Sequence, residues 1–267
     1  MAVSKQFQFG TAFTQLLHFG YHQAMSCIFP VAIFGTLAVS KWIDLPFIAR
    51  YDLILLVLLA VQLLMVISGL ETVDELKVIC VFHIIGLMLE LYKVHMGSWA
   101  YPEPALTKLY GVPLYSGFMY ASVASFMCQV WRRLKMDMTG WPGLVIAGSL
   151  GAAIYFNFFT HHFIADFRWW LTALVFIVFW KTKIYYTVRH RTYTMPLTLA
   201  FLLVGFFIWL AENIATFLGA WQYPDQQVVW KIVGFGKLSS WFLLVIISVI
   251  IVAQLKVVKA SRNKQQP

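Results

Sequence analysis

Long apolar stretches alternate with short polar segments along the whole chain. A helix needs about 20 residues to cross roughly 30 Å of hydrocarbon. Stretches that approach this length cover residues 23–40, 51–70, 76–97, 111–131, 143–162, 169–186, 196–219 and 229–255. Only helices and closed barrels satisfy every backbone group in lipid, and these stretches lack the alternation of a barrel strand. The pattern therefore predicts an all-α polytopic membrane bundle of about eight transmembrane helices.

The composition agrees with a bilayer as the solvent of this chain. Hydrophobic residues make up 61% of it and charged residues 12%, compared with about 25% charged residues in soluble domains. These values exclude a disordered chain, a secreted disulfide scaffold and a soluble nucleic-acid-binding protein. The three cysteines, Cys27, Cys80 and Cys128, have no CxxC spacing, so we expect neither a disulfide framework nor a thiolate metal site.

The distribution of basic residues predicts the orientation. Eight spans place both termini on one side, and 13 of the 20 Lys and Arg residues lie at the termini, in the loops after the second, fourth and sixth stretches, or within the ends of the stretches beside those loops. Six lie on the other side, and Lys237 falls within the last stretch. Because cytoplasmic loops carry the excess of positive charge, we expect both termini in the cytoplasm of a bacterial plasma membrane protein.

One motif occurs twice and predicts an internal duplication. Residues 90–103 read ELYKVHMGSWAYPE and residues 212–225 read ENIATFLGAWQYPD, and both fit E-x6-G-x-W-x-Y-P-[ED] at an offset of 122 residues. Each copy lies at the outer end of the third stretch in a set of four. We therefore expect two parallel four-helix repeats, about 23–131 and 143–255, followed by a basic cytoplasmic tail, 256–267.

Glu90 and Glu212 are the candidate catalytic residues. Each lies about two helical turns below the Trp and Tyr residues that mark the membrane interface, and therefore within hydrocarbon. An ionisable group at that depth is costly and is expected to face the bundle interior at a functional site. In the alternative interpretation, each glutamate accepts hydrogen bonds from neighbouring Trp, Tyr or Asn side chains and locks the two halves together.

Aromatic residues follow each glutamate at the same spacing. Single Trp and Tyr residues at this depth are ordinary interface anchors. Their repetition after both glutamates instead predicts aromatic walls over an acid, and the candidate substrate-binding residues here are Trp99, Tyr101, Asn213, Trp221 and Tyr223.

Three further polar residues are assigned to the same candidate site. Asn157 and His161 lie at the outer end of the fifth stretch, with His162 beside them. Adjacent His residues on a helix diverge by about 100°, so the pair does not predict a metal site. Lys237 is expected near mid-bilayer, about nine residues into the last stretch. Burial there favours the neutral lysine unless it pairs with a carboxylate, and Glu90 or Glu212 is the nearest by depth. In the alternative interpretation, such an ion pair is purely structural.

Five segments resemble a known family: RYDLILL (50–56), ETVDELKVICVFHIIGLMLELYKVHMGSWAYPE (71–103), GVPLYSGFMYASV (111–123), NFFTHHFIADFRW (157–169) and WLAENIATFLGAWQYP (209–224). They are similar to bacterial multi-pass membrane proteins of the YoaT-like type, which form a domain family of unknown function. The resemblance implies a bacterial plasma membrane and no established activity.

The candidate residues together predict an outward-opening cavity that binds an apolar lipid or isoprenoid. A protonated glutamate in such a cavity could donate a proton to a double bond, and aromatic faces could stabilise the resulting cation. A proton-coupled secondary transporter and a structural or accessory membrane subunit are the alternatives. Membrane lipid is the expected partner, and we expect no nucleic acid and no cofactor.

Overall fold

The structure is a computed structural model that describes residues 2–43 and 45–265, with side chains for residues 12–43 and 45–253. The helices are α1 (Ala2–Ser26), α2 (Ile28–Ser40), α3 (Arg50–Ile67), α4 (Val73–His95), α5 (Ser116–Arg133), α6 (Leu144–Thr160), α7 (Arg168–Val178), α8 (Leu197–Phe217), the short 3-10 helix η1 (Pro224–Gln226) and α9 (Gly236–Gln265). The side chains of the predicted basic tail lie outside the described residues.

The helices confirm a polytopic membrane fold. Within the described residues, α3, α4, α8 and the 236–253 part of α9 are long and apolar enough to cross a membrane. The pair α1 and α2, bent by 61° at Cys27, raises the number of candidate spans to five. Helices α2 to α9 each overlap one of the eight predicted stretches, but α6 and α7 are shorter than a full span. The count of eight therefore stays a prediction.

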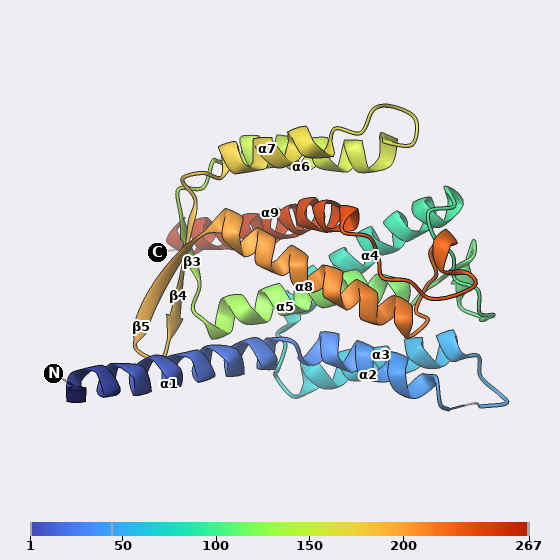
Figure 1. Cartoon of the computed structure of the whole chain (residues 1–267), viewed down its shortest axis with the longest axis horizontal. Helices are drawn as coiled ribbons and strands as arrows, with labels where there is room; N and C mark the ends of the chain where they lie inside the picture. The colour runs from blue at the N-terminus through green and yellow to red at the C-terminus, as the bar shows by residue number, and fades with distance from the viewer. Residues whose placement is uncertain (1, 44, 266–267) are drawn as a thin grey trace.

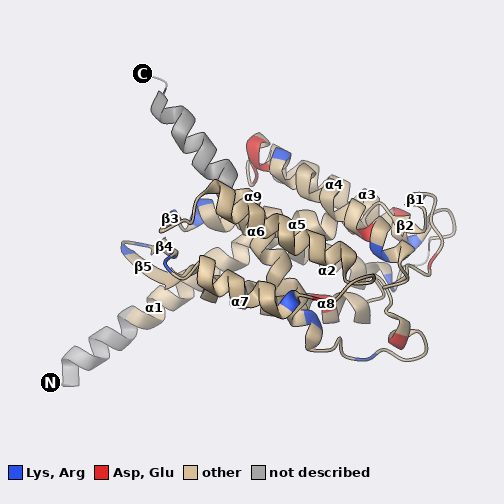
Figure 2. Ribbon diagram, turned by 90° about the horizontal axis from the view of Figure 1, so that it is seen from above, with Lys and Arg blue, Asp and Glu red and all other residues tan. Residues whose placement is uncertain are grey.

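The predicted sixth span, 169–186, is wrong in its second part. Helix α7 ends at Val178, and the chain continues as β4 (Lys183–Val188), which pairs with β5 (Arg191–Pro196) and β3 (Asp137–Thr139) in an antiparallel sheet. β-Branched and aromatic residues in KIYYTV favour a strand, and Arg189 adopts φ 55° in the tight turn before β5. Figure 2 shows Lys and Arg positions, in blue, on and beside this sheet, near α1.

The last span also begins later than predicted, and this moves Lys237. Helix α9 starts at Gly236, so Lys237 is its second residue and does not lie in the middle of the helix. The segment before it is held as a loop, because the Trp209 indole N–H donates to the Val233 carbonyl (3.0 Å) and the Val233 N–H donates to Asn213 Oδ1 (2.9 Å).

Three helix contacts recur in both halves of the bundle, and the second half adds a contact between α7 and α9 (Figure 1). In the first half α2 packs on α3, α4 on α5, and α2 on α5; in the second half α6 packs on α7, α8 on α9, and α6 on α9. Helices α5 and α9 contact each other across the two halves. A small hairpin, β1 (Lys108–Leu109) and β2 (Val112–Pro113), closes the loop between α4 and α5.

Arg50 ties the two halves together at one end of the bundle. Its guanidinium donates to the carbonyl oxygens of Leu37 (3.2 Å) and Leu218 (2.7 Å), near the C-terminal ends of α2 and α8. It also binds Glu103 Oε1 at 2.5 Å. The last carbonyl groups of a helix have no partner within the helix, so one cation here satisfies helix ends from both halves.

Candidate functional site

The two copies of the motif meet each other in an isolated antiparallel bridge. The Ala100 N–H donates to the Gln222 carbonyl and the Gln222 N–H donates to the Ala100 carbonyl, both at 2.9 Å. These residues are 122 positions apart, which is the offset of the motif itself. Each motif loop therefore pairs with the other at the corresponding residue of the motif.

Glu90 is fully engaged by aromatic side chains. Its Oε2 accepts hydrogen bonds from the Trp99 indole N–H and the Tyr101 hydroxyl, both at 2.7 Å, and its Oε1 accepts one from the Tyr120 hydroxyl at 2.8 Å. Only 4% of Glu90 is exposed. A carboxylate loses its water shell when buried, and these three donors replace it. Glu90 thereby holds α5 and the first motif loop to α4.

Glu212 has the corresponding environment in the second half. The Tyr223 hydroxyl donates to Oε1, and the Trp241 indole N–H donates to Oε2 at 2.5 Å. Tyr223 follows Glu212 by the same 11 residues that separate Tyr101 from Glu90. The Trp99 ring lies edge-on to the Tyr223 ring, with centroids 5.9 Å apart, so aromatic residues of the two motifs contact each other.

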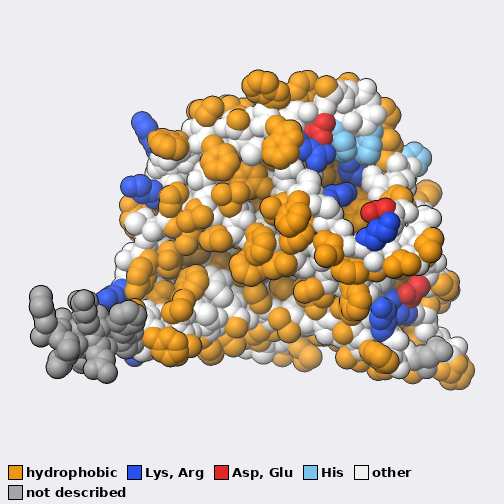
Figure 3. Space-filling model, viewed as in Figure 1, with side chains coloured by type: hydrophobic (Ala, Val, Ile, Leu, Met, Phe, Trp, Pro, Cys, Tyr) orange, Lys and Arg blue, Asp and Glu red, His pale blue; other side chains and the backbone are white. Residues whose placement is uncertain are grey.

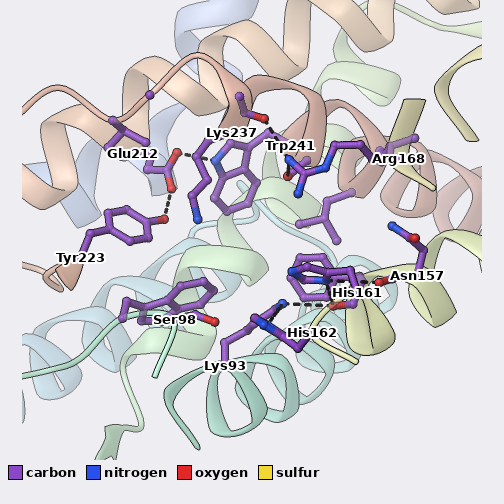
Figure 4. A pocket seen from close by; sticks show the side chains of 18 of the residues that line it. Lys93, Ser98, Asn157, His161, His162, Arg168, Glu212, Tyr223, Lys237 and Trp241 are labelled. Atoms are coloured by element: carbon purple, nitrogen blue, oxygen red, sulfur yellow. Dashed lines mark hydrogen bonds between the residues drawn. The ribbon is translucent and has the colours of Figure 1, made fainter. Parts of the chain in front are cut away.

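A cavity of about 480 Å³ lies beside this aromatic cluster. Its walls come from the C-terminal ends of α4 and α6, the loop after α8 and the first turns of α9 (Figure 4). The polar and charged residues that line it are Lys93, Ser98, Asn157, His161, His162, Arg168, Glu212, Asp225, Gln226, Lys237 and Ser240. Trp99, Tyr120, Ile154, Phe158, Tyr223, Val233, Trp241, Leu243 and Leu244 provide the apolar and aromatic part of the lining.

The surface around the mouth differs from the rest of that face. Figure 3 shows basic, acidic and His side chains gathered around a hollow on a face that is otherwise largely hydrophobic. Leu199, Leu203 and Phe207 of α8 and Ile177 of α7 are among the exposed apolar residues. An exposed apolar flank of this kind suits contact with lipid chains.

Two lysines face the cavity without a carboxylate partner. Lys93 Nζ donates to the Phe158 carbonyl (3.0 Å), lies 3.2 Å from His162 Nε2 and sits 4.1 Å above the Phe158 ring. Lys237 Nζ lies 4.4 Å from the centre of the Tyr223 ring. Within the part of the chain that the structure describes, neither lysine has a carboxylate oxygen within 4.0 Å, so the predicted ion pair of Lys237 with a glutamate is absent.

The loop after α6 positions the remaining polar groups. Asn157 Nδ2 donates to Asp166 Oδ1 (3.1 Å), and Asp166 binds the Arg168 guanidinium at 2.5 Å. Desolvation by burial, followed by the nearby Lys93 ammonium, lowers the pKa of His162 below its ordinary value. Among the described residues, no group of three His, Cys, Asp or Glu side chains could hold a metal ion.

The structure brings six of the ten candidate site residues to the cavity wall: Trp99, Asn157, His161, Glu212, Tyr223 and Lys237. Four do not line it. Glu90 and Tyr101 lie behind the wall in their own hydrogen-bonded cluster, Asn213 holds the loop before α9, and Trp221 is buried.

Sequence reasoning missed Lys93, Tyr120 and Trp241. Lys93 follows Glu90 by three residues and therefore shares its helix face. Counting Lys93 among the charges of the outer loops obscured its position next to the glutamate. Tyr120 follows Glu90 by 30 residues and Trp241 follows Glu212 by 29, so the two donors do not occupy equivalent positions at the motif offset of 122, and the repeat gave no signal for them.

Comparison with known proteins places the chain in a family. It is 61% identical over 248 residues to the "Uncharacterized protein YoaT" of Bacillus subtilis (strain 168), an overlap of 93% of this chain and 94% of that protein. Two crystal structures of MvINS, a mycobacterial Insig homologue, one of them a cross-linked trimer, align with 67% of this chain and 93% of theirs at 13% identity and TM-scores of 0.45 and 0.46. The family model described as "Protein of unknown function (DUF817)" matches residues 15–249, and the chain therefore belongs to that family.

Proposed function

We propose that this membrane protein binds a lipid or isoprenoid molecule from the surrounding bilayer in the cavity between its two helical repeats. The observation that carries the proposal is the cavity itself. It combines a polar end with apolar walls and opens on a hydrophobic face (Figure 3). Ligand pockets commonly have volumes of roughly 300–1,000 Å³, so about 480 Å³ suits a headgroup and the first part of a chain.

The architecture supports a site shared by the two repeats. The first repeat supplies Lys93, Ser98 and Trp99 from α4 and its motif loop, and the second supplies Glu212, Tyr223 and Lys237 from the equivalent region. The reciprocal Ala100–Gln222 bridge lies at the same junction. We place this junction toward the outer face of the membrane, following the positive charge on the opposite sheet and termini.

The hydrogen bonds favour binding over acid catalysis. An indole N–H can only donate, so the oxygen that faces Trp241 acts as an acceptor, and the other oxygen of Glu212 accepts from Tyr223. Hydrogen bonds of this kind stabilise the charged form of a carboxyl group. Glu212 and Glu90 are therefore proposed to hold the aromatic walls in place while the cavity receives the ligand.

Filling the cavity tests this function. Ser98 lines it, and Ser149 is exposed on the outer side of α6. We expect Ser98→Phe to reduce the lipid that copurifies with the protein, measured by mass spectrometry after detergent exchange, by about ten-fold or more. The matched variant Ser149→Phe should retain as much as the wild type. Equal retention in both variants, at unchanged thermal stability, would contradict a ligand in this cavity.

A further inference from the structure

The cavity end at which α4 and α9 meet is rich in hydrogen-bond donors. Lys237 Nζ contacts only ring faces among the described residues, at 4.4 Å from Tyr223 and 5.7 Å from Trp99, so its three donors are free. Ser98 Oγ is buried and has no partner among the described atoms. Lys93 adds a second ammonium from the opposite wall (Figure 4).

Among the described residues, no acidic group around the cavity forms an ion pair with either lysine. Both oxygens of Glu212 accept hydrogen bonds from Tyr223 and Trp241. Asp166, on the loop after α6, is paired with Arg168 at 2.5 Å. Asp225 lies exposed at the rim and has no cation within 4.0 Å among the described residues. Two cations held in one cavity without a salt-bridge partner repel each other, and an anion bound between them would relieve that repulsion.

The start of α9 adds to this positive potential. Gly236 and Lys237 belong to its first turn and line the cavity, and the N-terminal end of a long helix carries a partial positive charge. Gly234 and Gly236 have no side chains, so the backbone there stays open to a ligand.

We infer that the bound molecule carries an anionic phosphate headgroup, which lies between Lys93 and Lys237 and accepts a hydrogen bond from Ser98. Phosphate oxygens only accept, which matches a wall that mostly donates, and lysine binds phosphate as a point charge. A free phosphate ion has the same chemistry. The opening of the cavity on a hydrophobic face favours a lipid phosphate, whose chains stay in the bilayer. This inference rests on the proposed lipid-binding function.

The test compares ligands that differ only in the headgroup. The full-length protein in detergent is titrated with phosphatidic acid, with diacylglycerol of the same chains and with inorganic phosphate, and binding is followed by native mass spectrometry and calorimetry. We expect phosphatidic acid to bind about ten-fold or more tightly than diacylglycerol, the size of one charge-assisted hydrogen bond. Inorganic phosphate should bind more weakly than phosphatidic acid.

Substitution of one lysine localises the effect. Lys237→Gln should abolish the preference for phosphatidic acid over diacylglycerol, and Lys237→Arg should keep that preference. The Lys237 side chain makes no hydrogen bond to a described residue, so its substitution should disturb the fold little. The control is Lys231→Gln, which removes a charge from the exposed loop before α9, outside the cavity lining, and should behave as the wild type.

Each other outcome overturns a defined part of the inference. Equal binding of phosphatidic acid and diacylglycerol by the wild type would refute the phosphate headgroup and leave lipid binding standing. Inorganic phosphate that binds as tightly as phosphatidic acid would make this a free-anion site. Retention of neither lipid would remove the proposed function as well.

Discussion

At the scale of single residues, the two buried glutamates behave as anchors for aromatic donors. Glu90 gathers two residues of its own motif loop and Tyr120 of α5, while Glu212 gathers Tyr223 and Trp241 of α9. Hydrogen bonds to a charged acceptor contribute about 1.5–3 kcal/mol each, more than bonds between neutral groups. In each half, one carboxylate therefore joins its own helix, the motif loop that follows it and the next long helix of that half.

Glu90→Gln is expected to destabilise the protein. The glutamine amide replaces one acceptor oxygen by a donor, so at least one of Trp99, Tyr101 and Tyr120 loses its acceptor in a buried site. The cost should be about 1–3 kcal/mol, seen as a lower thermal midpoint in detergent. Asp225→Asn, which removes a charge from an exposed residue, is the control and should have little effect. An unchanged midpoint for Glu90→Gln would show that these hydrogen bonds are not formed.

At the scale of elements, α4 and α5 approach closely because glycines lie between them. A Cβ atom at Gly86 would come within 2.5 Å of the Tyr120 ring, and one at Gly117 within 2.8 Å of His83. Small residues permit close contact between membrane helices. At Gly86 the missing side chain also lets Tyr120 pass over α4 to reach Glu90. Packing and the hydrogen-bonded cluster therefore depend on the same glycine.

Gly86→Ala should displace Tyr120 and lower stability by about 1–3 kcal/mol, the usual cost of overpacking. The matched substitution is Gly35→Ala in α2, where the added Cβ would meet nothing within 4 Å. That variant should be neutral or slightly stabilising, because alanine favours a helix more than glycine does. Thermal unfolding of both variants provides the comparison. Equal midpoints would contradict the close contact between α4 and α5.

Two element boundaries show where hydropathy alone was insufficient. The stretch 169–186 is mainly apolar and carries charge only at Lys181 and Lys183 near its end, yet it divides into a helix and a strand, because residues 183–188 gain partners in β3 and β5. The stretch 229–255 begins with a loop, because side chains of α8 bind the backbone at Val233. In both cases a segment distant in the sequence decides the local conformation. A hydropathy pattern read over about 20 residues does not include that segment.

At the scale of the whole molecule, the two halves join at two points near the motif loops. The Ala100–Gln222 bridge pairs the motif loops, and Arg50 of the first half binds the end of α8 in the second. Residues in a hydrogen-bonded antiparallel pair have Cα atoms about 5.5 Å apart, a distance that a disulfide can span.

The double variant Ala100→Cys and Gln222→Cys, made after replacing Cys27, Cys80 and Cys128 by serine, should therefore form a disulfide under mild oxidation. The product is an internal cross-link, which a shift in gel mobility or peptide mapping reveals. Ala100→Cys with Ala165→Cys, on the exposed loop after α6, is the control and should remain reduced. Failure of the first pair to cross-link would refute the contact between the motif loops.

The orientation in the membrane is a second prediction at this scale. The described part of the molecule carries the β3–β4–β5 sheet and the motif loops at opposite ends (Figure 1). Because basic residues concentrate near the sheet, cysteines introduced by Arg189→Cys should be protected from a membrane-impermeant thiol reagent in intact cells, and those introduced by Gln222→Cys should react. The reverse pattern would invert the proposed topology, and the cavity would then open toward the cytoplasm.

The sequence by itself determined the class of this protein, its repeated motif and the pairing of each motif with a buried glutamate. These follow from local properties: the length of apolar runs, the cost of burying a charge and the spacing of residues on a helix. Only the tertiary structure decided which side chains share the cavity. Lys93 and Lys237 are 144 positions apart in the sequence, and their approach depends on how α4, α6 and α9 pack. Electrostatic complementarity between distant groups arises from that packing, and no single segment encodes it.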